Sequence, residues 1–400
     1  MPAGCGSLHT EISASIPGVT PPEILHWLHS RRDAMQESLR RYVVAESPSF
    51  NKAPVDRLGR RVAADWRRVG ARVNFLRQRE RGDHVRAEVW LGRGRPEGQI
   101  LVLGHLDTVY PLGALAQMPW RVSRGRACGP GTLDMKSGLV IALYAVAALR
   151  RAGIRPRKKF VFLWTTDEEI GSGTSRAAIE REARRSQAAL VLEPGAGLEG
   201  RLKTARKGVG EVELRVTGRA AHAGVNPAGG INAVHELALQ IGRIARFNEP
   251  RRGITVNADV VSGGTRTNVI AEQAVAQIDV RVTRAADARR LGRKFRALRP
   301  ILRGAKLEIR GGVDRPPMER TAGVVWLLRM AESLAGQMGL EVKESFTGGG
   351  SDGNFTAAIG TPTLDGLGGA GAGAHTRGEF VFVDSLPRRA ALLAQLLAHI

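Results

Sequence analysis

Three short apolar runs, each followed directly by acidic or imidazole side chains, constrain the fold of this chain more than any other feature. They cover residues 100–103, 160–164 and 188–192. Continuous apolar runs of this length are typical of strands that are buried on both faces of a sheet. In open α/β sheets, ligands bind at the edge formed by the carboxyl ends of the strands. The sequence therefore predicts an α/β protein with a polar site at one edge of a buried sheet.

The polar residues near these strand ends have the donor atoms of a metal site. The five candidate ligands are His105, Asp134, Glu169, Glu193 and His375. Two imidazoles with three carboxylates suit zinc, cobalt or manganese, and they differ from a thiolate site. Five protein ligands are too few for two separate closed shells. They suffice for two ions if one carboxylate bridges both and water fills the remaining positions.

A sixth polar residue, Asp107, stands two positions after His105 and so points to the same side of an extended chain. This spacing suits a carboxylate that orients a ligating imidazole through a hydrogen bond. Any one of these residues alone would be an ordinary solvated loop residue. Their joint occurrence after three separate predicted strands favours a shared site.

The segments around these residues resemble the motifs of the dinuclear zinc peptidases and deacylases. That family includes glutamate carboxypeptidase, acetylornithine deacetylase, succinyl-diaminopimelate desuccinylase and aminoacylase. The motifs occur in order as GHLDTVYP, GPGTLDMKSG, TDEEIGS, LEPG and GAHTRGEF. The likeness runs from about residue 20 to the C-terminus. The Tyr110-Pro111 ending of the first motif and the paired glutamates of the third look most like the glutamate carboxypeptidase branch.

The resemblance implies a specific ligand arrangement. Asp134 would bridge two divalent ions, most simply zinc, with cobalt or manganese as alternatives. His105 and Glu193 would complete one metal position, and Glu169 and His375 would complete the other.

The resemblance also implies roles for residues that do not bind metal. Glu168 would be the general base, and Asp107 would hold His105 in place. His222 would stabilise the oxyanion in the active site of a partner subunit. Asn268 and Arg281 would bind the terminal carboxylate of the substrate.

From about residue 207 the sequence pattern predicts a second unit. Its predicted strands and helices cover residues 209–217, 231–247, 254–262, 274–282, 286–298 and 306–310. This βαββαβ order is the ferredoxin-like arrangement. Residues 207–315 are therefore predicted to form an inserted dimerisation or lid domain, while 1–206 and 316–400 form the zinc-peptidase domain, with a central mixed sheet flanked by helices. Arg315, at the return, is a further candidate ligand for a substrate carboxylate. Residues 22–43 are predicted as one long helix.

By this resemblance, the expected activity is metal-dependent hydrolysis of an amide bond next to a C-terminal amino acid with a free carboxylate, such as glutamate. Deacylation of N-acyl amino acids is the alternative within the same family. The expected substrate is a small anionic N-acyl amino acid or a short peptide. The resemblance also points to a homodimer formed through the inserted domain.

Two other motif matches offer alternatives. Residues 349–353 fit the GxSxG pattern of serine hydrolases, and Asp365 and His375 follow in the matching order. This reading makes Ser351 the nucleophile, but it leaves most of the candidate metal ligands without a role. Residues 195–200 fit GxGxxG, but no helix is predicted after them, which argues against a dinucleotide site.

Composition narrows the remaining possibilities. The formal net charge is +22, but the arginines are spread along the chain and aromatic residues make up only 5%. This pattern argues against nucleic acid as a partner and favours a positive field that attracts anionic substrates. No uninterrupted apolar run approaches the ~18 residues of a membrane span. Residues 1–15 lack the pattern of a secretory signal, and two cysteines, Cys5 and Cys128, fit the cytoplasm.

Overall fold

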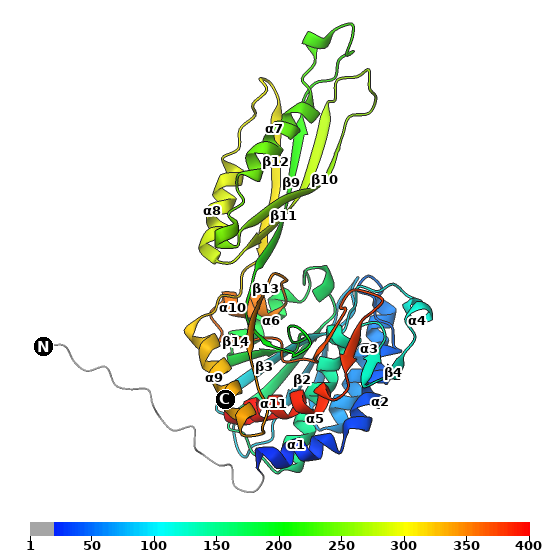
Figure 1. Ribbon diagram of the computed structural model, residues 1–400, viewed down its shortest axis with the longest axis vertical. Helices are drawn as coiled ribbons and strands as arrows, with labels where there is room; N and C mark the ends of the chain where they lie inside the picture. Colours follow the sequence, from blue (N-terminus) through cyan, green and yellow to red (C-terminus); the bar gives the residue numbers. More distant parts are fainter. Residues whose placement is uncertain (1–19) are drawn as a thin grey trace, which may run out of the picture.

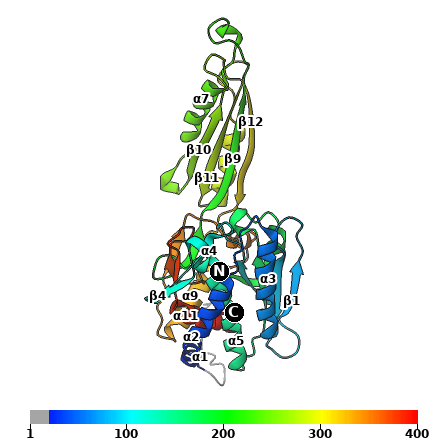
Figure 2. The same ribbon diagram turned by 90° about the vertical axis from the view of Figure 1, so that its right-hand side faces the viewer.

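The computed structural model describes residues 20–400 of the chain. The expectations that concern residues 1–15 and Cys5 lie outside this range. A large main domain contains the described residues on either side of 208–315, and an elongated inserted domain is formed by 208–315. In two views at right angles, the inserted domain extends away from the main domain, to which it is joined by two adjacent strands (Figures 1 and 2).

A six-stranded sheet forms the centre of the main domain. Its strands, in spatial order, are β1 (Arg72–Leu76), β2 (His84–Val89), β6 (Lys159–Thr165), β3 (Gln99–His105), β7 (Ser186–Val191) and β14 (Thr363–Leu364). Strands β6, β3, β7 and β14 are parallel, whereas β1 and β2 are antiparallel to their neighbours. The prediction of an α/β protein with a mixed sheet is therefore confirmed.

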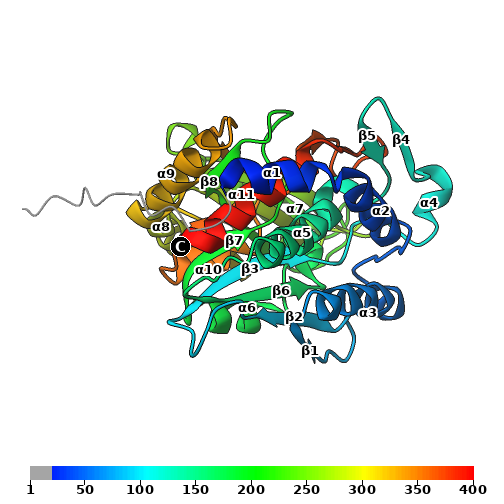
Figure 3. The same ribbon diagram turned by 90° about the horizontal axis from the view of Figure 1, so that it is seen from below.

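Helices cover both faces of this sheet, so the central strands are buried on both sides (Figure 3). On one face lie α1 (Pro21–His29), α2 (Arg32–Val43), α3 (Lys52–Arg68), α5 (Ser137–Arg151), α9 (Ala322–Gly336) and α11 (Ser385–His399). On the other lie α6 (Arg176–Ala183) and α10 (Gly353–Ala358). Along β3, Ile100 and Val102 pack into the first core, and Leu101 and Leu103 pack into the second. This alternation explains why the strand is apolar at successive positions.

Shorter elements surround the carboxyl end of the sheet. They are α4 (Ala114–Gln117), β4 (Arg121–Ser123), β5 (Arg126–Cys128), η1 (Thr132–Lys136), η2 (Glu168–Ile170), β8 (Leu202–Arg206), β13 (Glu344–Thr347), β15 (Gly371–Ala372) and β16 (Phe380–Phe382). Strands β15, β16, β5 and β4 form a small sheet, and β13 pairs with β8. These segments carry several of the polar residues described below.

Helix α5 is strongly apolar and lies in the core of the main domain. By length and composition, the span Thr132–Arg151 could cross a membrane. The sequence gives no such indication when only uninterrupted apolar runs are considered. However, most of this span is buried inside the protein, where α5 packs against α11, α2 and α1. Its apolar composition is therefore explained by its position in the core.

The inserted domain has its own sheet and its own core. Its elements are β9 (Gly208–Thr217), η3 (Pro227–Gly229), α7 (Ala233–Ala245), η4 (Pro250–Arg252), β10 (Thr255–Gly263), β11 (Gln273–Val282), α8 (Ala285–Arg296) and β12 (Lys306–Arg315). The strand order β10-β11-β9-β12 is antiparallel throughout. Buried side chains of the sheet, such as Leu214 and Ile278, pack with Leu237 of α7 and Phe295 of α8. The predicted ferredoxin-like arrangement is confirmed.

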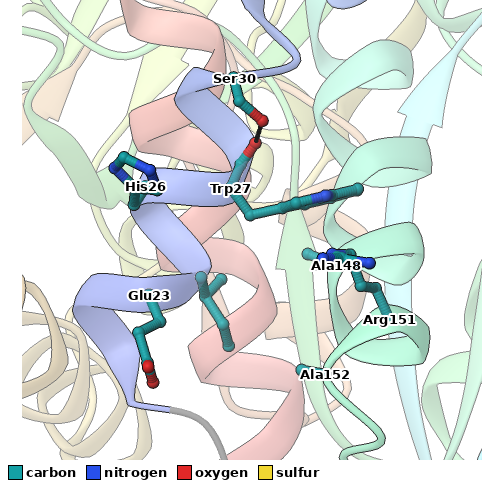
Figure 4. A pocket seen from close by; sticks show the side chains of 8 residues that line it. Glu23, His26, Trp27, Ser30, Ala148, Arg151 and Ala152 are labelled. Carbon is teal, nitrogen blue, oxygen red and sulfur yellow. Dashed lines mark hydrogen bonds between the residues drawn. The ribbon is translucent and has the colours of Figure 1, made fainter.

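The prediction of one helix over residues 22–43 is wrong, because the chain turns at Ser30 and forms two helices. The hydroxyl of Ser30 donates to the carbonyl of Trp27 at 2.6 Å, and this bond ends α1. Both helices pack on α5 and α11, and α2 also contacts α3. Trp27 of α1 lies beside Arg151 of α5 in a surface hollow of about 500 Å³ between α1 and α5 (Figure 4).

Candidate metal centre

Three of the five candidate ligands come from neighbouring strands of the central sheet. His105 is the last residue of β3, Glu169 follows β6 in the η2 turn, and Glu193 follows β7. Because β6, β3 and β7 are adjacent and parallel, their carboxyl ends meet at one edge of the sheet. The side chains that follow these strands are therefore brought together.

The other two ligands come from connecting segments. Asp134 lies in the η1 turn that precedes α5, and His375 lies in the loop between β15 and β16. His375 has a φ of 62°, a left-handed conformation that is uncommon for a residue with a side chain. Backbone conformations of this kind persist where the surrounding structure holds them in place, often at functional sites.

The structure brings all five residues together as two groups of three that share Asp134. In one group, His105 Nε2 lies 3.2 Å from Asp134 Oδ1 and 3.6 Å from Glu193 Oε1. In the other, His375 Nε2 lies 3.4 Å from Asp134 Oδ2 and 3.2 Å from Glu169 Oε2. Within each group, the potential ligand atoms all lie within 4.8 Å of one another. The two oxygens of Asp134 thus face different imidazoles, as a bridging carboxylate requires.

The chemistry of these donors fits divalent cations. Each group offers one imidazole nitrogen and two carboxylates, a set that suits zinc and similar ions. Glu169 Oε1 is buried and has no hydrogen-bond partner among residues 20–400. Hydrogen bonds to Asp134 and Glu169 raise the pKa of His375 to about 10, so these carboxylates strongly favour a positive charge beside them. A bound cation would satisfy this requirement.

Asp107 connects His105 to the turn that carries the two glutamates. Its Oδ1 lies 3.5 Å from His105 Nδ1, and its carboxylate accepts the backbone N–H groups of Glu168 and Glu169, each at 3.3 Å. Ser49 donates its hydroxyl to Asp107 Oδ2 at 2.8 Å. His105 Nδ1 lies closer to the backbone carbonyl of Asp107, at 3.0 Å, than to its carboxylate. The imidazole is therefore flanked by both groups of Asp107, and the predicted orienting role of the carboxylate stays a prediction.

Glu168 lies beside the ligands and is held by Arg315. The guanidinium Nη1 of Arg315 lies 2.9 Å from Glu168 Oε1, and Nη2 donates to Ser172 Oγ at 2.9 Å. Burial raises the pKa of Glu168 well above the usual value, although Arg315 opposes this shift. Arg315 was predicted as a ligand for a substrate carboxylate, whereas here its guanidinium is paired with a carboxylate of the protein itself.

The geometry contradicts the serine hydrolase alternative. Ser351 is fully buried, and its hydroxyl donates to Asp365 Oδ2 at 2.7 Å. The nearest imidazole that the sequence offered, His375, is turned toward Asp134 and Glu169 instead. Among the described residues, no histidine is hydrogen-bonded to Ser351, so the hydroxyl has no general base.

Comparison with known proteins agrees with this centre. Residues 101–399 match the model of Peptidase family M20/M25/M40. The chain belongs to this family. It is therefore a metal-dependent hydrolase that acts on peptide bonds, and the predicted likeness to the dinuclear zinc peptidases is confirmed.

Among M20 relatives, carboxypeptidase G2 of Pseudomonas sp. (strain RS-16) is 31% identical over 323 residues, which is 79% of this chain and 76% of that protein. Succinyl-diaminopimelate desuccinylase of Dechloromonas aromatica (strain RCB) is 29% identical over 332 residues, covering 78% and 86% of the two chains. The structure of aminopeptidase PepT from Bacillus cereus ATCC 10987 superposes with a TM-score of 0.76 at 21% identity, over 92% of this chain and 98% of that one.

The remaining predicted residues of this M20 protein lie in the inserted domain. His222 and Asn268 are exposed on adjacent loops, where the Ala223 N–H donates to the Asn268 carbonyl at 2.9 Å. The loop after β9, which carries His222, lies at the end of the inserted domain away from the main domain (Figure 1). Arg281, on β11, is paired with Asp279 at 2.9 Å. None of these three side chains contacts the metal centre of its own chain within residues 20–400.

Glu379 was not among the predicted site residues, but it organises the turn that contains Asp134. Its carboxylate accepts the N–H groups of Gly131, Leu133 and Asp134 at 3.0, 2.8 and 2.9 Å. The Tyr110 hydroxyl donates to it at 2.6 Å. Glu379 stands four residues after His375 in the GAHTRGEF motif, so its position in that motif was the available signal.

Arg206, which was also not among the predicted site residues, lies beside Glu193. Arg206 is buried, its Nη2 lies 3.8 Å from Glu193 Oε2, and its Nε donates to Asp365 Oδ2 at 2.6 Å. Its Nη1 also donates to the carbonyls of Gly349 and Gly350 at 3.1 and 3.0 Å. In a chain this rich in arginine, no sequence signal separates Arg206 from the surface arginines.

We expect Glu379→Gln to lower the affinity of the centre for zinc by ~10–100-fold, the usual cost of losing a partner that orients a ligand. The uncharged amide offers one acceptor oxygen where three backbone N–H groups now bind a carboxylate. Competition between the protein and a chelator measures this affinity. Glu341→Gln is the matched control, because Glu341 is an exposed glutamate of the same domain. Unchanged zinc affinity in Glu379→Gln would show that the turn holds Asp134 without this carboxylate.

Proposed function

We propose that this protein hydrolyses the amide bond next to a C-terminal amino acid with a free carboxylate, as a glutamate carboxypeptidase does. The observation that carries the proposal is the position of Glu168 beside two groups of metal donors that share Asp134. Similarity to carboxypeptidase G2 supports this choice of reaction. Deacylation of an N-acyl amino acid is the alternative, and similarity to the desuccinylase supports it.

The proposed centre holds two divalent ions, in the first instance zinc, with cobalt or manganese as alternatives. Asp134 would be shared, with His105 and Glu193 at one position and Glu169 and His375 at the other. When bound, such ions polarise a carbonyl and lower the pKa of a coordinated water molecule toward neutrality.

Glu168 is the proposed general base. Arg315 binds its Oε1, whereas its Oε2 has no hydrogen-bond partner among residues 20–400 and is free to accept a proton. A general base works best when its pKa lies near the working pH, and burial raises the pKa of Glu168 in that direction. Glu168 would take a proton from the attacking water and donate it to the leaving amine nitrogen.

Recognition of the substrate is assigned to the inserted domain. Asn268 and Arg281 would bind the free carboxylate, and His222 would donate a hydrogen bond to the oxyanion. In this structure Arg281 is paired with Asp279, so binding would require the guanidinium to exchange one carboxylate for another. The positive net charge of +22 favours approach of a small anionic N-acyl amino acid or peptide.

The position of His222 supports a homodimer. Its loop lies at the far end of the inserted domain, so His222 would serve the centre of a second chain more readily than its own (Figure 1). Strand β10 is an edge strand with Val260 and Val261 exposed, and unpaired edges of this kind favour association. The dimer would have twofold symmetry. We also propose a cytoplasmic location, which agrees with Cys128 forming no disulfide within residues 20–400.

Removing the metal should abolish the activity. We expect a chelator to stop release of the amino acid from N-acyl and dipeptide substrates, and zinc or cobalt to restore it. Metal analysis should find two ions per chain, and Asp134→Ala should lose both, because one carboxylate serves both positions. Full hydrolysis by metal-free protein would contradict the proposed reaction. The rates of amino acid release from dipeptides and from N-acyl amino acids should be compared. Faster release from peptides that end in glutamate would favour the carboxypeptidase, and faster release from N-acyl amino acids would favour the deacylase.

The adjacent glutamates should respond differently to the same substitution. Glu168→Gln should keep both ions but lower kcat by ~10²–10⁴-fold, because an amide cannot accept the proton. Glu169→Gln should weaken binding of one ion, because Glu169 faces His375. Metal content and kcat measured on the same preparations test this assignment. The reverse pattern would show that the two roles are exchanged.

A mixed dimer tests whether His222 acts across the interface. His222→Ala and Glu168→Gln chains should each be nearly inactive alone, the first because one oxyanion donor is worth ~10²–10³-fold in kcat. If His222 serves the partner, one site of the mixed dimer has both defects and the other has neither. About half of the normal activity per mixed dimer should then return. If mixed dimers form and no activity returns, His222 does not act across the interface.

A further inference from the structure

A hollow of about 530 Å³ lies on the main domain and is not lined by any of the candidate metal ligands. Its walls come from the loop between β7 and β8, the segment after α9, and the β16–α11 connection. Apolar side chains line much of it, including Leu198, Leu340, Phe382 and Leu392. Leu198 is 56% exposed, although it is a large apolar residue. A volume of this size is typical of sites for small ligands.

One buried cation faces this hollow without a partner. Arg389 is only 9% exposed, yet among residues 20–400 its guanidinium has neither an ion pair nor a hydrogen bond. Gly200 leaves the space for this side chain, since a Cβ atom at Gly200 would lie 2.2 Å from Arg389 Nη2. The backbone φ of Gly200, +69°, also favours glycine. The fold therefore accommodates the guanidinium at this position.

The positive charge of Arg389 is unfavourable at this buried position unless an anion binds it. Burial alone lowers the pKa of Arg389 to about 10, because no carboxylate offsets the loss of water. Arg388 and Arg389 also lie near the start of α11, where the helix dipole disfavours positive charge. A bound anion would remove both penalties.

The carboxylates at the edge of the hollow are already paired with other residues. Glu199 lies 3.4 Å from Arg201, Glu341 lies 3.3 Å from Lys343, and Asp384 is bonded to Arg32. In contrast, two exposed arginines of the lining, Arg124 and Arg388, have no ion pair among the described residues. The hollow therefore has an excess of positive charge.

We propose that this hollow binds a small organic anion. Its carboxylate or phosphate oxygens would pair with Arg389, and its apolar part would lie against Leu198 and Phe382. The planar guanidinium suits both of these anionic groups, because it can donate two parallel hydrogen bonds to either. The apolar lining favours an anion with an aromatic or aliphatic body over an inorganic ion.

The hollow lies next to the segments that carry Glu193 and His375, but neither of these candidate ligands lines it. Its Leu198–Glu199 wall follows Glu193 in the chain, and Gly195 N–H donates to the Gly369 carbonyl at 3.0 Å. The segment from Gly369 leads on to His375. An anion in the hollow therefore does not compete for the metal positions, and its binding can be measured separately from activity.

Thermal unfolding of the metal-loaded protein tests the proposal. Benzoate and phenyl phosphate are the probes, with acetate, inorganic phosphate and sodium chloride compared at equal ionic strength. We expect at least one aromatic probe to raise Tm more than chloride does, increasingly with concentration. The comparison of the two aromatic probes shows whether a carboxylate or a phosphate is preferred. Acetate and inorganic phosphate should have smaller effects, because they lack an apolar part.

Three variants locate the binding. Arg389→Met should lose the rise in Tm, and without anion it should be at least as stable as the wild type, because no ion pair is removed. Asp134→Ala should keep the rise, which excludes anion binding at the metal centre as its cause. Arg60→Met is the matched control, because Arg60 is an exposed arginine on α3. It should also keep the rise.

Two results would overturn the proposal. One is that no aromatic anion stabilises the wild type more than chloride does. The other is that Arg389→Met keeps the full rise in Tm. If Arg389→Met does not fold, the double variant Arg124→Ala, Arg388→Ala replaces it. This variant should bind the probe more weakly, and an unchanged rise in Tm would equally contradict the site.

Discussion

Repulsion among the carboxylates of Asp134, Glu169 and Glu193 is the constraint on which the site depends. These groups converge on two imidazoles, with the donor atoms of each set within 4.8 Å, where there is little water to screen them. Left alone they would separate or take up protons. Groups outside the cluster offset this repulsion: the guanidinium of Arg206 lies 3.8 Å from Glu193, and Glu379 accepts the backbone N–H of Asp134. The cluster is therefore prepared for positive charge before any cation binds.

The order of the strands decides which side chains meet. Strand β3 lies between β6 and β7, so His105 has Glu169 on one side and Glu193 on the other. The η2 turn then separates neighbouring glutamates, with Glu169 facing His375 and Glu168 facing Arg315. The Asp107 carboxylate accepts both backbone N–H groups of this turn, so the residue that flanks the His105 imidazole also holds the turn that carries the two glutamates.

The sequence could predict the parts of this arrangement that depend on local pattern. Apolar runs located β3, β6 and β7, and the polar residues after them include three of the five candidate ligands that the structure brings together. The βαββαβ order of the inserted domain followed from periodicity in the same way. Glu379 and Arg206 could not be assigned roles, because their effect depends on tertiary contacts; Glu379 and Asp134 are 245 residues apart. The break at Ser30 was missed because no glycine or proline marks it in the sequence.

The junction between the domains is in direct contact with the proposed base. Arg315 is the last residue of β12, so its backbone belongs to the sheet of the inserted domain. Its guanidinium lies in the main domain, on Glu168 and Ser172 and over the ring of Phe355. Arg315 therefore joins the last strand of the inserted domain to the proposed base within a single chain, and its charge opposes the rise in the pKa of Glu168 that burial causes.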